Sequence, residues 1–332
     1  MRGRVLRASI AKGKTIMTTT ITHKQVHING TRLHVAISGP SKITSKENCI
    51  LCLHGFPEGW IGWRPLMREM PDITIYAPDL RGFPSSDLAD NGYDIITLTD
   101  DIDQLINELG LIKPILMTHD WGGALGWIYA HRFSNKISRL VVANCPHPKT
   151  LVRAVFKFED FQTFRIPWVP PFQIPFLPES VLTSLIGRKL LALSFTLREG
   201  SKGKMDKDLV REIVNRFQYS KTMRGPVNYY REFVQTLLHP ETRERLKDIY
   251  SHSIQVPVSL IWGLEDGALS AKVAQTSYID AGCSVEWRPL EGIGHFVDLE
   301  APELLAKELY RLIIQDDSHT IELNTVTTLA LA

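Results

Sequence analysis

The sequence has few cysteines for its length. Its 332 residues contain four, at irregular spacing: Cys49, Cys52, Cys145 and Cys283. A disulfide framework in a chain of this size needs more, so we expect a reducing, cytoplasmic environment. Cys49 and Cys52 form a C-x-x-C pattern, but their apolar surroundings are typical of a buried strand with the two thiols on opposite faces. Because no second cysteine or histidine pair has zinc spacing, we expect no metal site.

Long apolar runs and blocks of like charge are also missing. No stretch approaches the roughly 20 apolar residues that span a membrane. Lysine and arginine number 38 against 36 aspartate and glutamate residues, which gives a net charge of +2 and argues against a nucleic-acid partner. The hydrophobic content of 44% is enough for a large core. We therefore expect a soluble monomer or homodimer that acts on a small molecule.

The two ends of the chain lack a regular pattern. Residues 1–17 carry five basic side chains and no acid, without the apolar core of a secretory signal. Two interpretations fit. Residues 1–19 are an organelle-targeting peptide, or they are a disordered or mis-called extension; in the mis-called case Met17 is the true start. Residues 317–332 show no clear periodicity, and we expect a loose C-terminal tail there.

Strand and helix patterns alternate along most of the chain. Asn29-Gly30, flanked by alternating segments, favours a tight hairpin at the start. Short runs that are apolar throughout then alternate with amphipathic segments, which is typical of parallel strands covered on both faces. The pattern predicts a doubly wound α/β sheet, with core segments over residues 20–150 and 251–316. The expected later strands are residues 50–53, 73–77, 115–118, 140–143, 258–262 and 285–287.

The alternation stops between residues 151 and 250. Aromatic and proline residues crowd the first part of this segment, and helical periodicity follows. A mostly helical insertion between two parallel strands is typical of a cap over the carboxyl edge of the sheet, where such sheets bind ligands. A membrane-facing surface is the competing interpretation of so many aromatic residues, although the prolines interrupt any long amphipathic helix.

Residues 115–127 run from an apolar strand through a sharp turn into a helix. Thr118 and Gly122 stand two positions before and after Asp120, which are the small residues that a nucleophile elbow requires. Aspartate at the centre, where serine is usual, suits displacement at a saturated carbon and leaves an alkyl ester on the enzyme. An N-cap aspartate without chemistry is the alternative.

A second motif, Leu-His-Gly-Phe-Pro-Glu over residues 53–58, follows an earlier strand. In this place the backbone N–H of Phe56 can form an oxyanion hole with that of Trp121, next to the nucleophile. These amides would hold the negative oxygen while water attacks the ester. We expect His54 to be structural and to stand in the wall of the substrate pocket.

Ester hydrolysis needs a base, and His295 lies in a glycine-bounded loop between the last strand and the last helix. Asp266, just after the strand over residues 258–262, is the carboxylate expected to orient the imidazole. The adjacent Glu265 is the alternative acid, whereas Asn144 has no charge. The order nucleophile, acid, histidine is that of the α/β-hydrolases. Because nucleophile and base are both protein groups, we expect no cofactor.

Four motifs taken together resemble those of the soluble epoxide hydrolases. They are His54-Gly-Phe-Pro-Glu58 with Trp60, Trp63 and Arg64, Asp79-Leu-Arg-Gly82, His119-Asp-Trp-Gly-Gly123, and Asn144-Cys-Pro-His-Pro148. The resemblance covers about residues 25–315. It implies the α/β-hydrolase fold, with a mostly parallel eight-stranded sheet, helices on both faces and a helical cap over residues 151–250. It also implies that Asp120, Asp266 and His295 form the catalytic triad.

The resemblance further implies a ring-opening acid in the cap. One of the two cap tyrosines of that family matches Tyr230, and Tyr229 is the adjacent alternative. A phenol stays protonated at neutral pH and can donate to a developing alkoxide. Trp168 stands where the second tyrosine is expected. The residues expected to line the substrate pocket are His54, Trp168, Phe172, Tyr229 and Phe296.

The sequence thus predicts an epoxide hydrolase that forms a vicinal diol through an ester on Asp120, hydrolysed by water that His295 and Asp266 activate. Haloalkane dehalogenases share the aspartate elbow. Because the indole N–H groups of Trp121 and Trp168 would suit a departing halide, that activity is the first alternative. The second alternative is a non-catalytic α/β-hydrolase that only binds a small ligand.

Overall fold

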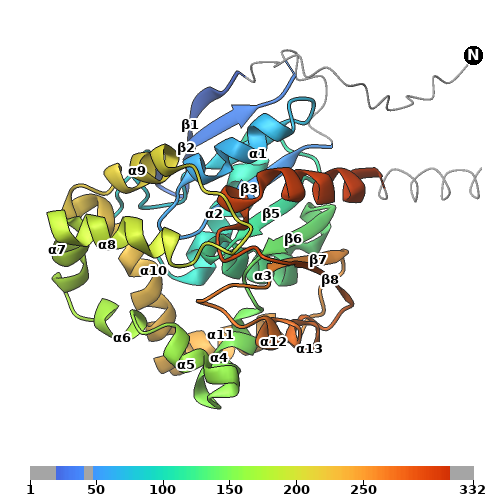
Figure 1. Cartoon of the computed structure of the whole chain (residues 1–332). Coiled ribbons are helices and arrows are strands. Elements are labelled where there is room, and N and C mark those ends of the chain that lie inside the picture. The colour runs from blue at the N-terminus through green and yellow to red at the C-terminus, as the bar shows by residue number, and fades with distance from the viewer. Residues whose placement is uncertain (1–19, 41–47, 315–332) are drawn as a thin grey trace, which may run out of the picture.

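The computed structural model describes residues 20–40 and 48–314. Figure 1 shows a central sheet with helices on both sides. Its eight strands are β1 (Thr22–Ile28), β2 (Thr31–Ser38), β3 (Ile50–Leu53), β4 (Ile75–Pro78), β5 (Ile115–His119), β6 (Arg139–Ala143), β7 (Val258–Gly263) and β8 (Val285–Leu290). Their order across the sheet is β1-β2-β4-β3-β5-β6-β7-β8.

The helices before the predicted cap are α1 (Arg64–Glu69), α2 (Ile95–Leu109) and α3 (Trp121–Phe133). Those between β6 and β7 are α4 (Pro148–Phe156), α5 (Gln162–Arg165), α6 (Val169–Phe172), α7 (Leu177–Thr183), α8 (Leu185–Thr196), α9 (Lys207–Asn215), α10 (Ser220–Leu238) and α11 (Pro240–Ile249). The last are α12 (Ala271–Ala274), α13 (Ser277–Ala281), α14 (Val297–Glu300) and a helix over residues 302–314. The predicted N-terminal extension and C-terminal tail lie outside the described residues.

The sheet opens with the predicted hairpin. Asn29 and Gly30 have φ angles of +41° and +71°, as a tight two-residue turn requires, and Ile28 pairs with Thr31 across it. β2 pairs antiparallel with both β1 and β4, and every later pair is parallel. The prediction of a mostly parallel eight-stranded sheet is therefore confirmed.

Alternate residues of the parallel strands face two separate cores. Leu51 and Leu53 belong to the core that includes α2 and α3, whereas Ile50 and Cys52 belong to the core that includes α1 and the helix over residues 302–314. Cys49 lies in the first core, so the predicted placement of Cys49 and Cys52 on opposite faces is confirmed. Burial on both faces explains why these strands are apolar throughout.

Two strand boundaries differ from the predicted ones by more than one residue. β4 begins at Ile75 because the N–H of Ile73 closes a turn with the carbonyl of Met70 before strand pairing starts. β8 continues to Leu290, three residues beyond the apolar run, because Arg288, Pro289 and Leu290 keep pairing with β7. Strand length here follows backbone pairing, which apolar content alone does not report.

Helices α4 to α11 follow one another without a strand between β6 and β7, and Figure 1 shows them gathered at the left and lower left of the sheet. The aromatic residues of this segment face two ways. Phe172 is buried, whereas a set of phenylalanines is between 61% and 79% exposed: Phe156, Phe158, Phe161, Phe164 and Phe176. Within the described residues, no helix is long and apolar enough to cross a membrane.

Candidate active site

Asp120 stands in the turn between β5 and α3. Its backbone has φ +48° and ψ −117°, a conformation that residues other than glycine rarely adopt. This conformation projects the carboxylate out of the strand–helix junction. A Cβ on Gly122 would lie 2.2 Å from the carbonyl oxygen of Leu53, and one on Gly55 would lie 2.4 Å from the Cβ of Asp120. These two glycines let the loop after β3 pack directly against the turn.

His295 lies between two carboxylates. Its Nδ1 is 2.8 Å from Oδ2 of Asp266, and its Nε2 is 3.6 Å from Oδ2 of Asp120. The other oxygen of Asp266 accepts the backbone N–H groups of Ala268 and Leu269 at 2.7 and 2.9 Å, which fixes the carboxylate. The structure therefore brings together the three side chains that the sequence singled out as a triad.

Two neighbouring residues clarify the choice of acid. Glu265 is exposed and accepts hydrogen bonds from the N–H and hydroxyl of Ser201, both at 2.6 Å, so its carboxylate points away from His295. Asn144 is fully buried and donates from Nδ2 to Oδ2 of Asp266 at 2.7 Å. Asn144 thus holds the acid in place.

Mutual attraction keeps Asp120 and His295 charged at neutral pH. Burial would raise the pKa of Asp120, but the close contact and charge of His295 lower it to about 2. Burial would lower the pKa of His295, but the charge of Asp266 and the contact with Asp120 raise it to about 9. Asp120 is therefore an ionised carboxylate, the form that can act as a nucleophile.

The loop after β3 supplies a backbone donor to Asp120. The N–H of Phe56 donates to Oδ1 of Asp120 at 2.9 Å. Trp121 is the first residue of α3, so its N–H has no partner inside the helix. One prediction for this loop is wrong: His54 does not line the cavity, because its Nδ1 donates to the carbonyl of Gly55 and its Nε2 accepts the N–H of Leu80. These two hydrogen bonds of His54 hold the loop after β3 in place.

A cavity of about 430 Å³ lies over Asp120. Its walls include the predicted residues Trp168, Phe172, Tyr230 and Phe296, together with aliphatic side chains from α4, α8 and α10. Tyr229 was expected here and is absent from the lining. Its hydroxyl donates to the carbonyl of Arg81 at 3.0 Å, outside the cavity, because consecutive residues of α10 point in different directions.

Tyr230 meets both tryptophans of the pocket. Its ring stands edge-on to that of Trp121, with centroids 4.9 Å apart. Burial and the charge of Asp120 raise the pKa of the phenol, while the nearby side chains of Trp121 and Trp168 oppose the rise. The phenol stays protonated at neutral pH, with both indoles beside it.

A buried cluster behind the nucleophile escaped the sequence reasoning. His119 places Nδ1 3.0 Å from Oε2 of Glu58 and 3.6 Å from Oδ1 of Asp298, and all three side chains are buried. Burial and the charge of Glu58 raise the pKa of Asp298 well above its usual range, so that acid is protonated. Oε2 of Glu58 also accepts the N–H of Gly55, which connects the cluster to the loop after β3.

The same cluster is the one group in the described residues whose ligand atoms could hold a metal ion, since these atoms lie within 4.8 Å of one another. The Nε2 of His119 already donates to the carbonyl of His295, and charge from Glu58 outweighs burial to raise the pKa of His119 well above its usual range. A protonated imidazole has no lone pair for a metal. The cluster therefore fits a structural network better than a metal site.

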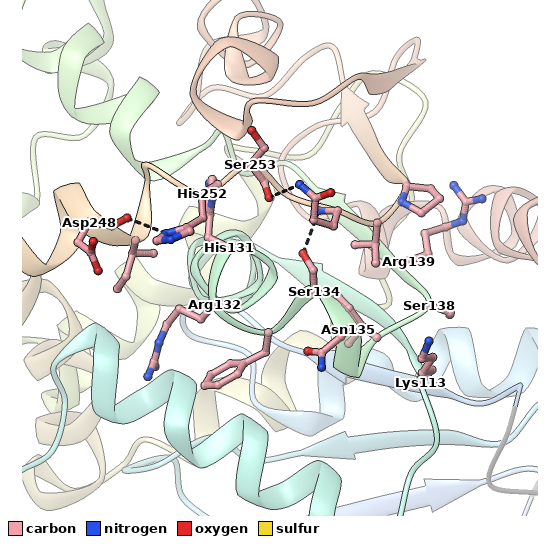
Figure 2. Close-up of a pocket in the computed structure, with 16 residues that line it drawn as sticks. Lys113, His131, Arg132, Ser134, Asn135, Ser138, Arg139, Asp248, His252 and Ser253 are labelled. Atoms are coloured by element: carbon pink, nitrogen blue, oxygen red, sulfur yellow. Dashed lines mark hydrogen bonds between the residues drawn. The ribbon is translucent and has the colours of Figure 1, made fainter.

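A larger open cavity of about 1180 Å³ lies elsewhere and lacks comparable chemistry. Figure 2 shows it at the end of α3, beside Arg132, Ser134 and the segment around Ser253. Lys113 and Ser138, which precede β5 and β6, place it at the amino edge of the sheet, opposite Asp120. The hydroxyl of Ser134 accepts the N–H of Gln255 and donates to the carbonyl of Ala130, so no base activates it.

Sequence comparison agrees with this geometry. The family described as alpha/beta hydrolase fold matches residues 48–302. The chain belongs to the α/β-hydrolase family and is a hydrolase.

Its relatives include proteins named epoxide hydrolases. Epoxide hydrolase 4 of Mus musculus is 29% identical over 293 residues, covering 86% of this chain and 77% of the relative. Epoxide hydrolase 3 of Xenopus tropicalis is 30% identical over 299 residues, covering 87% of this chain and 76% of the relative. The crystal structure of an epoxide hydrolase from Vigna radiata matches with a TM-score of 0.71 and 27% identity, over 89% of this chain and 98% of that one.

Proposed function

We propose that the protein is an epoxide hydrolase that opens an epoxide to a vicinal diol through an ester on Asp120. The observation that carries this proposal is the arrangement of Asp120, His295 and Tyr230 around one apolar cavity. An ionised carboxylate and a protonated phenol are the nucleophile and acid that ring opening requires. The epoxide hydrolases among the relatives support the same activity.

In the first step Asp120 attacks a ring carbon. The N–H of Phe56 holds Oδ1, so Oδ2 is the oxygen free to attack. The C–O bond of the oxirane breaks as the new ester bond forms, and Tyr230 donates its proton to the departing alkoxide. Because the side chains of Trp121 and Trp168 lower the pKa of this phenol, they stabilise the phenolate left behind and strengthen Tyr230 as an acid.

In the second step water hydrolyses the ester. Esterification removes the negative charge of Asp120, which takes away one of the contacts that raise the pKa of His295. The imidazole can then release its proton, which returns to the Tyr230 phenolate, and take one from the attacking water, with Asp266 balancing the charge. The ester carbonyl oxygen is Oδ1, already beside the N–H of Phe56, and the N–H of Trp121 completes the oxyanion hole. Expulsion of the diol restores Asp120.

Haloalkane dehalogenation is the second candidate, because two indole N–H groups border the cavity. A leaving halide needs stabilisation but no proton. Both indoles, however, also lie beside the phenol of Tyr230 and lower its pKa, which supports an acid that opens epoxides over a halide cradle. The predicted cap, residues 151–250, supplies Trp168 and Tyr230 in either case.

Turnover of matched substrates tests the proposal. Purified enzyme should convert aryl and alkyl epoxides to vicinal diols, and it should release little halide from bromoalkanes of similar size. Halide release without diol formation would favour the dehalogenase. Binding of both substrate classes without turnover would favour a non-catalytic ligand-binding protein.

A further inference from the structure

The cavity wall contains one cation outside the triad. Among the residues that the structure describes, Arg198 is the only arginine or lysine that lines the active-site cavity, and it lies just after α8. Its guanidinium carbon lies 4.5 Å from the centroid of the Trp168 ring. Since the side chain of Trp168 in turn lies beside the phenol of Tyr230, one indole ring separates this positive charge from the proposed acid.

Arg198 has no acidic partner among residues 20–40 and 48–314. Three acids near it in the fold already accept backbone N–H groups. Glu199 accepts the N–H of Met205, and Glu265 accepts the N–H of Ser201. Glu300 accepts the N–H groups of Gly200 and Gly294. The half-buried guanidinium therefore remains available to an anionic group on a ligand in the cavity.

The position of Arg198 is fixed relative to the catalytic loop. Its carbonyl accepts the N–H of His295 at 3.1 Å. A Cβ on Gly294 would lie 1.9 Å from the same carbonyl oxygen, so the two backbones are in close contact. Trp168 covers one face of the guanidinium and leaves its edge for hydrogen bonding.

We propose that Arg198 binds a carboxylate on the substrate, so that the preferred substrates are epoxides with a carboxylate a short distance from the oxirane. The planar guanidinium can hold both oxygens of a carboxylate, while Trp168 sets its orientation. The carboxylate then lies on the Arg198 side of Trp168 and the oxirane oxygen on the Tyr230 side. This inference rests on the proposed epoxide hydrolase activity.

A series of epoxyalkanoates of increasing chain length, each compared with its uncharged primary amide, tests the inference by kinetics. At the best chain length the wild-type enzyme should favour the acid, and Arg198→Gln should abolish that preference. A hydrogen bond to a charged group is worth roughly 1.5–3 kcal/mol, so kcat/KM for the acid should fall about 10- to 150-fold, mainly through KM. Turnover of the amide should fall by a smaller factor, because the charge of Arg198 also lowers the pKa of the Tyr230 phenol, so the ratio of acid to amide turnover is the measure of the site.

Two variants serve as controls. Arg198→Lys keeps the charge but loses the two-oxygen contact, and it should restore part of the preference. Lys189→Gln removes one exposed positive charge from α8 outside the cavity, and it should behave like the wild type. If no chain length shows a preference for the acid, or if Arg198→Gln slows acid and amide equally, the proposed carboxylate site is wrong.

Binding of the product separates this inference from the proposed activity. Calorimetry should detect binding of the dihydroxy acid to the wild type, and the corresponding amide should bind the wild type more weakly. Both compounds should bind Arg198→Gln more weakly than the acid binds the wild type. Binding of this kind without turnover of any epoxide would support the carboxylate site and refute the epoxide hydrolase. Diol formation from neutral epoxides without selective acid binding would support the activity and refute the role of Arg198.

Discussion

The phenol of Tyr230 distinguishes epoxide opening from halide displacement at the level of one residue. General acid assistance is worth about 10²–10⁴-fold, so Tyr230→Phe should slow alkylation by an epoxide at least about 100-fold. Alkylation by a bromoalkane needs no proton and should persist in this variant, whereas Trp121→Phe or Trp168→Phe should impair it. Single-turnover alkylation rates on one epoxide and one bromoalkane measure this. A Tyr230→Phe enzyme that opens epoxides at nearly the parental rate would refute the assignment of the acid.

Individual residues were predictable where the local chain dictates their position. Asp120 and His295 lie in turns whose glycines are required by close backbone contact, so short motifs locate them. Tyr229 and His54 were misplaced because facing a cavity depends on the direction of one side chain. Asp298 gave no usable signal, since its partners Glu58 and His119 come from distant parts of the chain.

At the scale of the element, the elbow between β5 and α3 depends on Gly122. The Cβ in Gly122→Ala would lie 2.2 Å from the carbonyl oxygen of Leu53, which is backbone and cannot rotate away. Overpacking of this kind costs about 1–3 kcal/mol, and the shift should also move Asp120 and reduce turnover. Urea denaturation measures the loss of stability.

Gly267→Ala is the matched control, since a Cβ there would have no heavy atom within 4 Å. It should leave the free energy of unfolding within about 0.5 kcal/mol of the wild type, as surface substitutions usually do. Equal stability of Gly122→Ala and Gly267→Ala would show that the elbow is not tightly packed.

Elements of the core were easier to predict than those between β6 and β7. Apolar strands buried on both faces leave a clear pattern, as in β3 and β5. The short helices α5 and α6 do not, because each has only four residues and exposed aromatic or proline neighbours. Phe172 points inward because it packs against Tyr230 of α10, a contact that the local sequence does not report.

For the whole molecule, the Asp120–His295 ion pair makes stability depend on pH. Asp120 has a pKa lowered from 3.8 to about 2, so its contribution is present above 3.8 and is lost as the pH falls through about 2. His295 has a pKa raised from 6.5 to about 9, so its contribution is full below 6.5 and is lost as the pH rises through about 9. These two groups together favour the folded state most between about pH 4 and pH 6.5.

Urea denaturation at about pH 5.5 and about pH 9.5 tests this dependence. The wild type should lose more stability between the two values than His295→Gln, which has no imidazole to deprotonate. A parallel decline in both proteins would mean that other groups dominate and that His295 is not held in its charged form.

The covalent ester on Asp120 is tested most directly by mass spectrometry of His295→Gln after reaction with an epoxide. Without the base, alkylation should proceed once and hydrolysis should stall. The protein mass should then increase by the mass of one epoxide, and the addition should map to the peptide that contains Asp120. An unmodified peptide from an enzyme that still consumes epoxide would mean that water attacks the ring directly, which would contradict the proposed mechanism.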